Sequence, residues 1–189
     1  MIITDFLERN AREFPNDIAL VEINPEIKED RRVTWKEFEL IEPNPKTSYR
    51  REITWGVFNE KANRFANLLL QRGVKKGDKV AILMMNGLEW LPIYFGILKT
   101  GALAVPLNFR YSADEIEYCV NLAEVDVLVF SNAFIGRVEE IADRISKGRL
   151  LMYVGEGCPG FADDYNSFAA NCSSQSPMEI GRASCRERV

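Results

Sequence analysis

The feature that most constrains the fold is a regular alternation of apolar strand and helix patterns that begins at residue 79. The strand patterns are KVAILM (79–84), ALAVPL (102–107), DVLVF (126–130) and RLLMYV (149–154). Helix patterns lie between and after them, at residues 86–101, 112–124, 134–147 and, more weakly, 161–172. Strands that alternate with helices at this spacing form βαβ units. The sequence therefore predicts an α/β fold, with a parallel sheet, right-handed crossovers and helices on both faces.

Capping signals mark both ends of the helix predicted at residues 86–101. Asn86 and Glu89 have the spacing of an N-terminal capping box, and Gly101 is expected at the end of the helix. Pro92 falls in the second turn of this prediction, where a proline bends a helix.

The N-terminal region predicts a helix followed by a strand. Residues 3–14 are expected to form a short helix that Thr4 caps and Pro15 ends. Residues expected to line one side of this helix are Phe6, Ala11 and Phe14. IALVEI, at residues 18–23, is the strand pattern.

Residues 24–52 form an irregular insertion that contains a near repeat. RRVTWKEFE begins at residue 31 and RREITWGVFN at residue 50. We interpret the insertion as a duplicated strand or a hairpin. In the first copy Thr34 and Glu37 have capping-box spacing, but Pro43 and Pro45 stop any helix that begins there.

The second copy is expected to open a long amphipathic helix. Val57 stands three residues after Thr54, in the place of the acidic residue, so the capping box is lost. Apolar residues then recur with helical spacing at Phe58, Ala62, Phe65 and Leu69. Packing of this stripe should outweigh a missing cap worth about 1 kcal/mol, and the helix should end near Gly73.

Composition excludes several kinds of chemistry. The chain of 189 residues has no histidine, which excludes Ser-His-Asp, Cys-His and His-ligated metal sites within it. Its net charge of −4 gives no reason to expect nucleic acid as a partner. The four cysteines form no close pair, and no segment has the pattern of a signal peptide or a membrane span. We expect a cytoplasmic protein with reduced thiols.

Four local patterns are candidates for a functional site. VGEGCPG (154–160) has three glycines after a strand but lacks the G-x-G-x-x-G order, which favours an ordinary turn over a nucleotide loop. The acidic pairs Asp163–Asp164 and Asp114–Glu115 stand at helix starts, where carboxylates complement the helix dipole. Ser112 and Glu115 also form a full S-x-x-E box.

The remaining candidates are apolar. Cys119 falls on the apolar side of its helix and is predicted to be a core thiol. Trp90, Tyr94 and Phe95 could line an apolar pocket, although core packing is the more common use of such residues. No catalytic, cofactor-binding or metal residue is predicted in this chain.

Residues 54–130, with the N-terminal helix and FPNDIALVE, resemble the N-terminal subdomain of the adenylate-forming enzymes. LKTGALAVPLN (98–108), ITW, GVKKGDKVAIL and NFRYSADEIEY follow that family in order and spacing. The resemblance covers roughly residues 1–175 and is nearest to acyl-CoA synthetases that act on fatty acids. Val57 departs from the family, which has an acidic residue after the Thr-aromatic pair. The insertion leaves open which Thr-Trp copy takes the family position, and we favour the second.

The resemblance implies an ATP-dependent carboxylic acid–CoA ligase, which forms an acyl-adenylate and then acyl-CoA. Such an enzyme uses ATP, Mg²⁺ and coenzyme A, with a carboxylic acid as substrate. The family's phosphate-binding loop and catalytic lysine have no counterpart in this sequence, so we expect an incomplete domain that is inactive alone. The alternatives are a standalone binding or scaffold domain, and an adenylating enzyme for an amino or aryl acid.

The last residues have a different character. IGRASCRERV (180–189) has no apolar period and is similar to one reading frame of a common DNA-sequencing adapter. We therefore expect a domain at residues 1–178 and a non-native tail at 179–189. Uncovered strand edges and apolar faces in such a fragment predict poor solubility or homo-oligomers.

Overall fold

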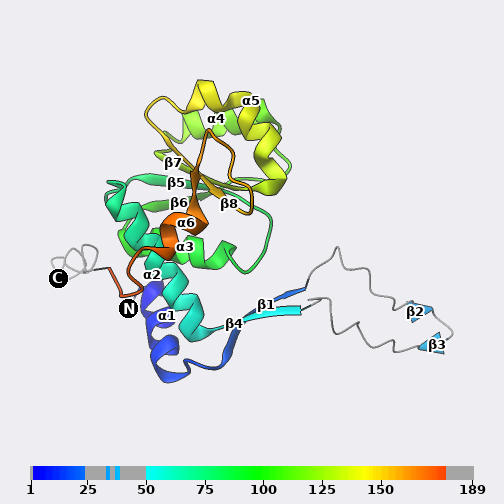
Figure 1. Cartoon of the computed structure of the whole chain (residues 1–189), viewed down its shortest axis with the longest axis vertical. Coiled ribbons are helices and arrows are strands. Elements are labelled where there is room, and N and C mark those ends of the chain that lie inside the picture. Colours follow the sequence, from blue (N-terminus) through cyan, green and yellow to red (C-terminus); the bar gives the residue numbers. More distant parts are fainter. Residues whose placement is uncertain (1, 24–32, 35–36, 39–49, 178–189) are drawn as a thin grey trace.

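The computed structural model describes residues 2–23, 33–34, 37–38 and 50–177. Its centre is a parallel sheet of five strands in the order β6-β5-β7-β8-β9 (Figure 1). The strands are β5 (Lys79–Leu83), β6 (Leu103–Pro106), β7 (Val127–Ser131), β8 (Leu150–Val154) and β9 (Asp163–Asp164). The predicted α/β fold with a parallel sheet is confirmed.

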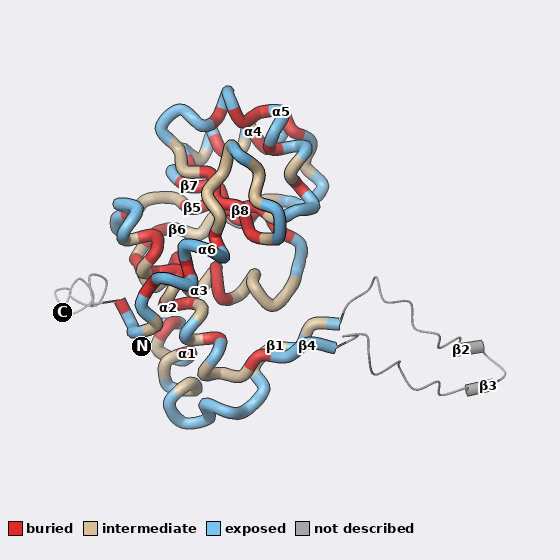
Figure 2. Tube along the Cα trace, in the orientation of Figure 1, coloured by how far each residue is buried: buried red, intermediate tan, exposed pale blue. Residues whose placement is uncertain are grey.

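Helices cover both faces of this sheet. One face carries α2 (Trp55–Gln71), α3 (Trp90–Thr100) and α6 (Tyr165–Ala170). The other face carries α4 (Ala113–Leu122) and α5 (Ile135–Ile145), with the 3-10 turn η1 (Asn132–Phe134) before α5. A further helix, α1 (Ile3–Glu13), packs against α2. Figure 2 shows the buried residues concentrated along the strands and the inner sides of these helices.

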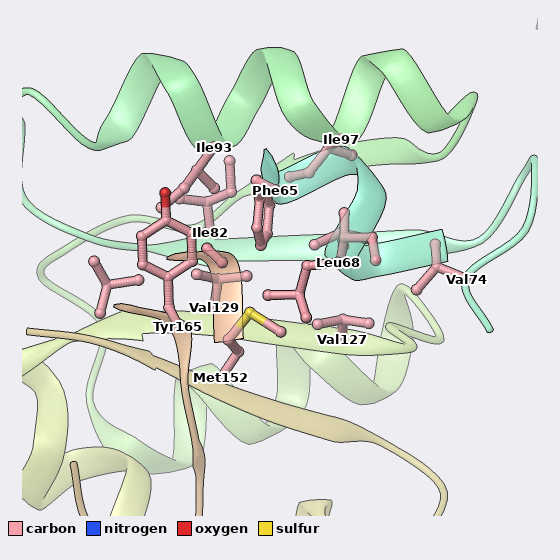
Figure 3. Packing of buried hydrophobic residues seen from close by; sticks show 14 of the residues in the cluster. Phe65, Leu68, Val74, Ile82, Ile93, Ile97, Val127, Val129, Met152 and Tyr165 are labelled. Atoms are coloured by element: carbon pink, nitrogen blue, oxygen red, sulfur yellow. The ribbon is translucent and has the colours of Figure 1, made fainter. Parts of the chain in front are cut away.

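Each strand supplies side chains alternately to two apolar cores, because successive side chains of a strand point to opposite faces. In β7, Val127 and Val129 belong to the core beneath α2, α3 and α6, which we name the first core. Leu128 and Phe130 belong to the core beneath α4 and α5, the second core. Figure 3 shows the first core, with Phe65 between α3 and the strands.

Helix α2 follows the predicted stripe. Its four apolar positions, Phe58, Ala62, Phe65 and Leu69, are all buried. Gly73 follows the helix end with φ of 86°, as expected of a helix-terminating glycine. The cap was predicted to be lost, but half of it is present, since the Thr54 hydroxyl accepts a hydrogen bond of 3.3 Å from the Val57 N–H. Only the reciprocal carboxylate is missing.

Helix α3 begins later than predicted. Its first residue is Trp90, and Glu89 makes no side-chain cap, so the expected box with Asn86 is not formed. Pro92 is consequently the third helical residue, where a missing N–H costs no intrahelical hydrogen bond and the expected bend has no cause. Gly101 ends the helix with φ of 79°, as predicted.

Helix α1 has the predicted limits but a different cap and a different buried side. Thr4 lies within the helix and is buried, while the Ile2 N–H donates to the Asp5 carboxylate at 3.0 Å. Leu7 is buried, whereas Phe6 and Phe14 are exposed. The assignment of both phenylalanines to the packed side was therefore wrong, because the helix turns Thr4 and Leu7 inward instead.

The insertion joins two antiparallel strands. β1 (Ile18–Ile23) pairs with β4 (Arg50–Thr54), which supports the hairpin interpretation (Figure 1). Within it, β2 (Val33–Thr34) pairs with β3 (Glu37–Phe38), so Thr34 and Glu37 face each other across a strand pair and do not cap a helix. The rest of the insertion and the predicted tail, residues 24–32, 35–36, 39–49 and 178–189, lie outside the described residues.

The two edges of the parallel sheet are short. Leu103 of β6 and Leu107, the residue after it, donate to carbonyls of Asp78 and Ile82 on the β5 side, so the backbone of Ala104 and Pro106 faces outward. At the opposite edge β9 has only two residues. The segment predicted as a weak helix at 161–172 thus divides into this strand and the shorter α6.

No helix among the described residues is long and apolar enough to cross a membrane.

Candidate functional site

The candidate site lies where the carboxyl ends of the parallel strands meet. The chain leaves β5 toward α3 on one face of the sheet and leaves β7 toward α5 on the other, and β5 and β7 are neighbours. In open α/β sheets, ligands bind outside the carboxyl ends of the strands at such a reversal. A hollow at this edge is therefore the expected place for a ligand.

A hollow of about 310 Å³ opens between β1 and the start of α3. Its wall includes the segment that follows β5, so it adjoins the carboxyl edge. The lining residues are Leu20, Val21, Glu22, Ile23, Asn86, Gly87, Leu88, Trp90 and Leu91. Such a lining suits apolar contact with a ligand.

Glu22 is the one ionisable residue in this lining, and its charge is already paired. Its carboxylate accepts 2.6 Å from the Arg51 guanidinium and 3.4 Å from the Leu88 N–H. The carboxylate thus joins the β1–β4 ribbon to the turn before α3. This arrangement holds the wall of the hollow in place and offers no free acid or base.

The aromatic candidates of the sequence divide between the hollow and the core. Trp90 lines the hollow and stacks on Tyr94, with ring centroids 5.4 Å apart. Phe95 instead packs edge-on against Phe58 at 5.3 Å. Trp90 and Tyr94 also pack against the first core. Of the three, only Trp90 combines pocket lining with core packing.

A polar link that the sequence did not predict fixes the start of α3. The Glu89 carboxylate accepts 2.6 Å from Lys61 of α2 and 3.4 Å from the hydroxyl of Tyr165. Figure 3 shows the Tyr165 hydroxyl directed toward α3. Burial, and then the charge of Glu89, raises the pKa of Tyr165, so this hydroxyl stays a donor. No sequence signal brings these residues together, since they lie on three separate helices.

The glycine-rich stretch forms a turn, as predicted. It follows β8, and the Tyr153 hydroxyl donates to the Glu156 carbonyl at 2.8 Å across it. The thiol of Cys158 contacts the Ala162 carbonyl at 3.3 Å, and burial raises its pKa. A thiol in that state is a poor nucleophile at neutral pH.

Asp114, Glu115 and Asp164 stand at helix starts, as predicted, whereas Asp163 lies in β9. Ser112 and Glu115 form the reciprocal box, at 3.3 Å and 2.8 Å. The Ser112 N–H and then its hydroxyl, which donate to the Glu115 carboxylate at 2.8 Å and 3.0 Å, lower the pKa of Glu115. Asp164 accepts 2.9 Å from the Asn166 N–H at the start of α6, and its pKa is lowered chiefly by the Ser167 hydroxyl. Asp163 pairs with Arg72. These carboxylates are committed to structural contacts.

Cys119 departs from its prediction. It is only half-buried and lies outside both cores, because its helix turns Ile116 and Val120 toward the sheet. It lies near the Tyr111 hydroxyl, whose pKa it raises. The assignment of Cys119 to the core was wrong.

The described residues do not fit ATP with Mg²⁺ by themselves. Among them, no group of three or more His, Cys, Asp or Glu side chains could hold a metal ion. The hollow carries no unpaired cation that could neutralise a phosphate, since its one charged residue is the carboxylate of Glu22. No chemical step can be assigned to these residues.

Comparison with known families identifies the chain. Residues 43–175 match the family described as AMP-binding enzyme. The chain belongs to the AMP-binding enzyme family. The matched range contains Thr54 and Trp55 and excludes Thr34 and Trp35, which supports the second copy as the one in the family position.

The curated proteins to which the chain is similar include CoA ligases. The chain is 35% identical over 113 residues to a medium/long-chain-fatty-acid–CoA/3-oxocholest-4-en-26-oate–CoA ligase of Mycolicibacterium smegmatis, covering 60% of this chain and 20% of that protein. It is 36% identical over 107 residues to a crotonobetaine/carnitine–CoA ligase of Salmonella typhimurium, covering 56% and 20%. The chain thus spans about a fifth of the length of these relatives.

Solved structures of the AMP-binding family share the fold. An anthranilate CoA ligase in complex with anthranoyl-AMP superposes with a TM-score of 0.72 and 26% identity, over 91% of this chain and 28% of that one. A putative long-chain-fatty-acid CoA ligase from Rhodopseudomonas palustris superposes with a TM-score of 0.71 and 23% identity, over 94% of this chain and 38% of that one. This similarity supports the fold alone.

Proposed function

We propose that this chain is the N-terminal part of an ATP-dependent carboxylic acid–CoA ligase. The observation that carries the proposal is the AMP-binding match over residues 43–175. It is supported by the identity of 35% with a fatty-acid–CoA ligase over 113 residues. In the proposed reaction a carboxylate attacks the α-phosphate of ATP to give an acyl-adenylate and pyrophosphate. The thiol of coenzyme A then attacks the acyl carbon, which forms the thioester and releases AMP and the thiol proton.

The role proposed for the present residues is structural. They supply a covered parallel sheet, a paired wall at its carboxyl edge and an apolar hollow beside it. The residues that cradle phosphate would come from the part of the relatives that this chain does not span. The 189-residue chain is therefore expected to be inactive alone.

A fatty acid is the proposed substrate class, on the basis of the relative from Mycolicibacterium smegmatis. An aryl acid is the second candidate, because the anthranilate ligase superposes over 91% of this chain. Mg²⁺, which balances phosphate charge in such reactions, is proposed with ATP and coenzyme A. The unpaired thiols of Cys119, Cys158 and Cys172 favour a reducing compartment, which supports a cytoplasmic location.

The test is to sequence the source DNA outward from the codons of residues 171–177 and to express the longest open frame that contains them. Carboxylate-dependent exchange of pyrophosphate into ATP is then measured with medium- and long-chain fatty acids, carnitine and anthranilate. We expect exchange with a fatty acid by the longer protein and none by the 189-residue chain.

Two results would change the proposal. A genuine stop codon near residue 178, with no exchange, would favour a standalone binding or scaffold domain. Exchange only with anthranilate would keep the reaction and replace the substrate class.

A further inference from the structure

Side chains of α2 hold the segment that follows α6 by its main chain. We name residues 171–177 the strap. Asn67 donates both amide hydrogens, to the carbonyls of Ser173 at 2.8 Å and Gln175 at 3.0 Å. Asn63 donates to the carbonyl of Ser174 at 2.8 Å. These are long-range contacts, since the hydrogen-bonded partners lie more than 100 positions apart in the sequence.

Arg64 holds the beginning of the strap in the same way. Its guanidinium donates to the carbonyl of Ala170 at 2.9 Å and to that of Cys172 at 2.7 Å. Asn67 follows Arg64 by three positions and Asn63 by four, the spacings at which side chains of a helix are neighbours, so the three residues form one group of donors, which we name the donor row. All five hydrogen bonds of this donor row go to main-chain carbonyls, four in the strap and one, that of Ala170, at the end of α6. Elsewhere on α2, Gln71 accepts from the Cys172 thiol at 3.5 Å.

The strap covers the edge of the first core with little apolar contact of its own. Only Cys172 and Pro177 are buried, and Cys172 is 4% exposed. Most of the other strap side chains face solvent. A segment held mainly by polar contacts near the surface opens more easily than the strands of a buried sheet.

The far end of the strap reaches an ion pair between two other helices. The Ser176 hydroxyl donates to the Glu8 carboxylate of α1 at 2.8 Å. The same carboxylate oxygen accepts from Lys99 of α3 at 2.9 Å, and the Lys99 side chain is only 3% exposed. In this structure the strap therefore places its own Cys172 at the edge of the first core and its Ser176 on the Glu8–Lys99 pair.

We propose that the strap is a latch, which α2 holds through main-chain carbonyls and which opens as a unit while the parallel sheet stays folded. Its closed state buries the strap's own Cys172 and adds the Ser176 hydroxyl to the Glu8–Lys99 pair that joins α1 to α3. This proposal does not depend on the proposed ligase activity, since it concerns contacts within the described residues. Its tests accordingly measure accessibility and not catalysis.

The decisive variant is Asn67→Asp in the 189-residue chain. It keeps the size of the side chain but replaces the amide nitrogen, which donates both hydrogens, with a carboxylate oxygen that faces two carbonyls. Intact protein is alkylated with iodoacetamide for a series of times, and the modification of each cysteine is read by peptide mass spectrometry. We expect alkylation of Cys172 to become roughly tenfold faster, because two hydrogen bonds of the closed state are lost. Asn121→Asp, the same change at an exposed position of α4, is the control and should leave the rate unchanged.

Amide hydrogen exchange of β5 and β7 in the same variants separates the latch from general unfolding. Faster alkylation of Cys172 with unchanged exchange in the strands supports the latch. Unchanged alkylation would overturn it, because the α2 contacts would then not control access to Cys172. An equal acceleration in the strap and the strands would also overturn it, because the strap would then open only with the whole domain.

Arg64→Ala provides a second test, because the lost charge and the released strap should change the alkylation rate of Cys172 in opposite directions. The charge of Arg64 lowers the pKa of the Cys172 thiol, against the larger raising effect of burial. Removing that charge alone should slow alkylation, since the thiolate is the reactive form. Release of the strap should instead speed it up, and we expect the faster rate. A slower rate would show that the strap remains closed without Arg64 and would overturn the role of the donor row.

Discussion

The two faces of the parallel sheet are assembled in different ways. On one face, α4 and α5 each connect two strands of the same sheet, so the second core forms from consecutive segments. On the other face only α3 connects two strands, whereas α2 precedes the parallel strands in the chain and α6 follows them, and Asn63 of α2 reaches a carbonyl 111 positions away. The first kind of face follows from local periodicity. The second also needs polar contacts between distant segments.

The largest expected effect tests whether the two faces are packed equally well. Phe65 belongs to the first core, where its ring lies 5.4 Å edge-on from that of Tyr165, and Phe134 belongs to the second core. Both residues are almost fully buried. Phe65→Ala and Phe134→Ala should each lower the free energy of unfolding by about 3–5 kcal/mol, as measured by urea denaturation. A much smaller cost for Phe65→Ala would mean that the first core is loosely packed.

Replacing a glycine with alanine should lower the stability of the protein on one face of the sheet and raise it on the other. A Cβ added at Gly96 would lie 2.9 Å from the Ala62 carbonyl oxygen and 2.8 Å from the Phe65 ring, because α3 and α2 approach closely there. Gly96→Ala should therefore destabilise the protein by about 1–3 kcal/mol. A Cβ at Gly136 of α5 meets nothing within 4 Å, so Gly136→Ala should stabilise by about 0.5–1 kcal/mol. Thermal unfolding of both variants checks the pair, and a stabilising Gly96→Ala would contradict the close approach.

Removing an N-terminal helix cap should lower the stability by less than these core substitutions, and by different amounts on the two faces. Ser112 of α4 belongs to a reciprocal box with Glu115, whereas Thr54 of α2 only accepts from the Val57 N–H. Ser112→Ala should cost about 1 kcal/mol, and Thr54→Ala should cost less because fewer contacts are lost. Denaturation midpoints at neutral pH measure both. The reverse order would show that the Thr54 cap contributes more to α2 than its single hydrogen bond indicates.

The smallest effect concerns acid stability. Hydrogen bonds lower the pKa of Glu115 on one face and of Asp164 on the other. A carboxyl whose folded pKa lies below its unfolded value stabilises the protein above the unfolded pKa, which is about 4 for these groups. That stabilisation is lost as the pH falls through the folded pKa. Glu115→Gln and Asp164→Asn should each flatten the decline of the melting temperature below about pH 4, and an unchanged decline in both variants would exclude this cause.

The difference between the faces also explains what the sequence could predict. The four longer strands of the parallel sheet, the stripe of α2 and the box at Ser112 depend on neighbours within a few residues, and these were predicted correctly. The two-residue β9 was instead placed in a predicted helix. Glu89 was misassigned because its local spacing to Asn86 fits a box, while its partners Lys61 and Tyr165 come from other helices. The inward turn of Thr4 in place of Phe6 likewise depends on how α1 packs against α2.

The candidate site was less predictable for the same reason. Trp90 was recognised as a possible pocket residue, since aromatic side chains commonly serve that use. The contribution of β1 to the hollow, and the contact of Glu22 with Arg51 and Leu88, arise only when the ribbon folds beside α3. Neither contact has a local sequence signal.

The outer strands of the parallel sheet have a consequence for how copies of this chain can meet. Pro106 presents no N–H on the open side of β6, and the opposite border is a two-residue strand of aspartates. Prolines, charges and short length all discourage a further strand from adding to a sheet. Any self-association of the chain should therefore proceed through apolar side chains that face solvent, such as Met85, Phe109 and Leu122, and not by growth of a continuous intermolecular sheet from this core.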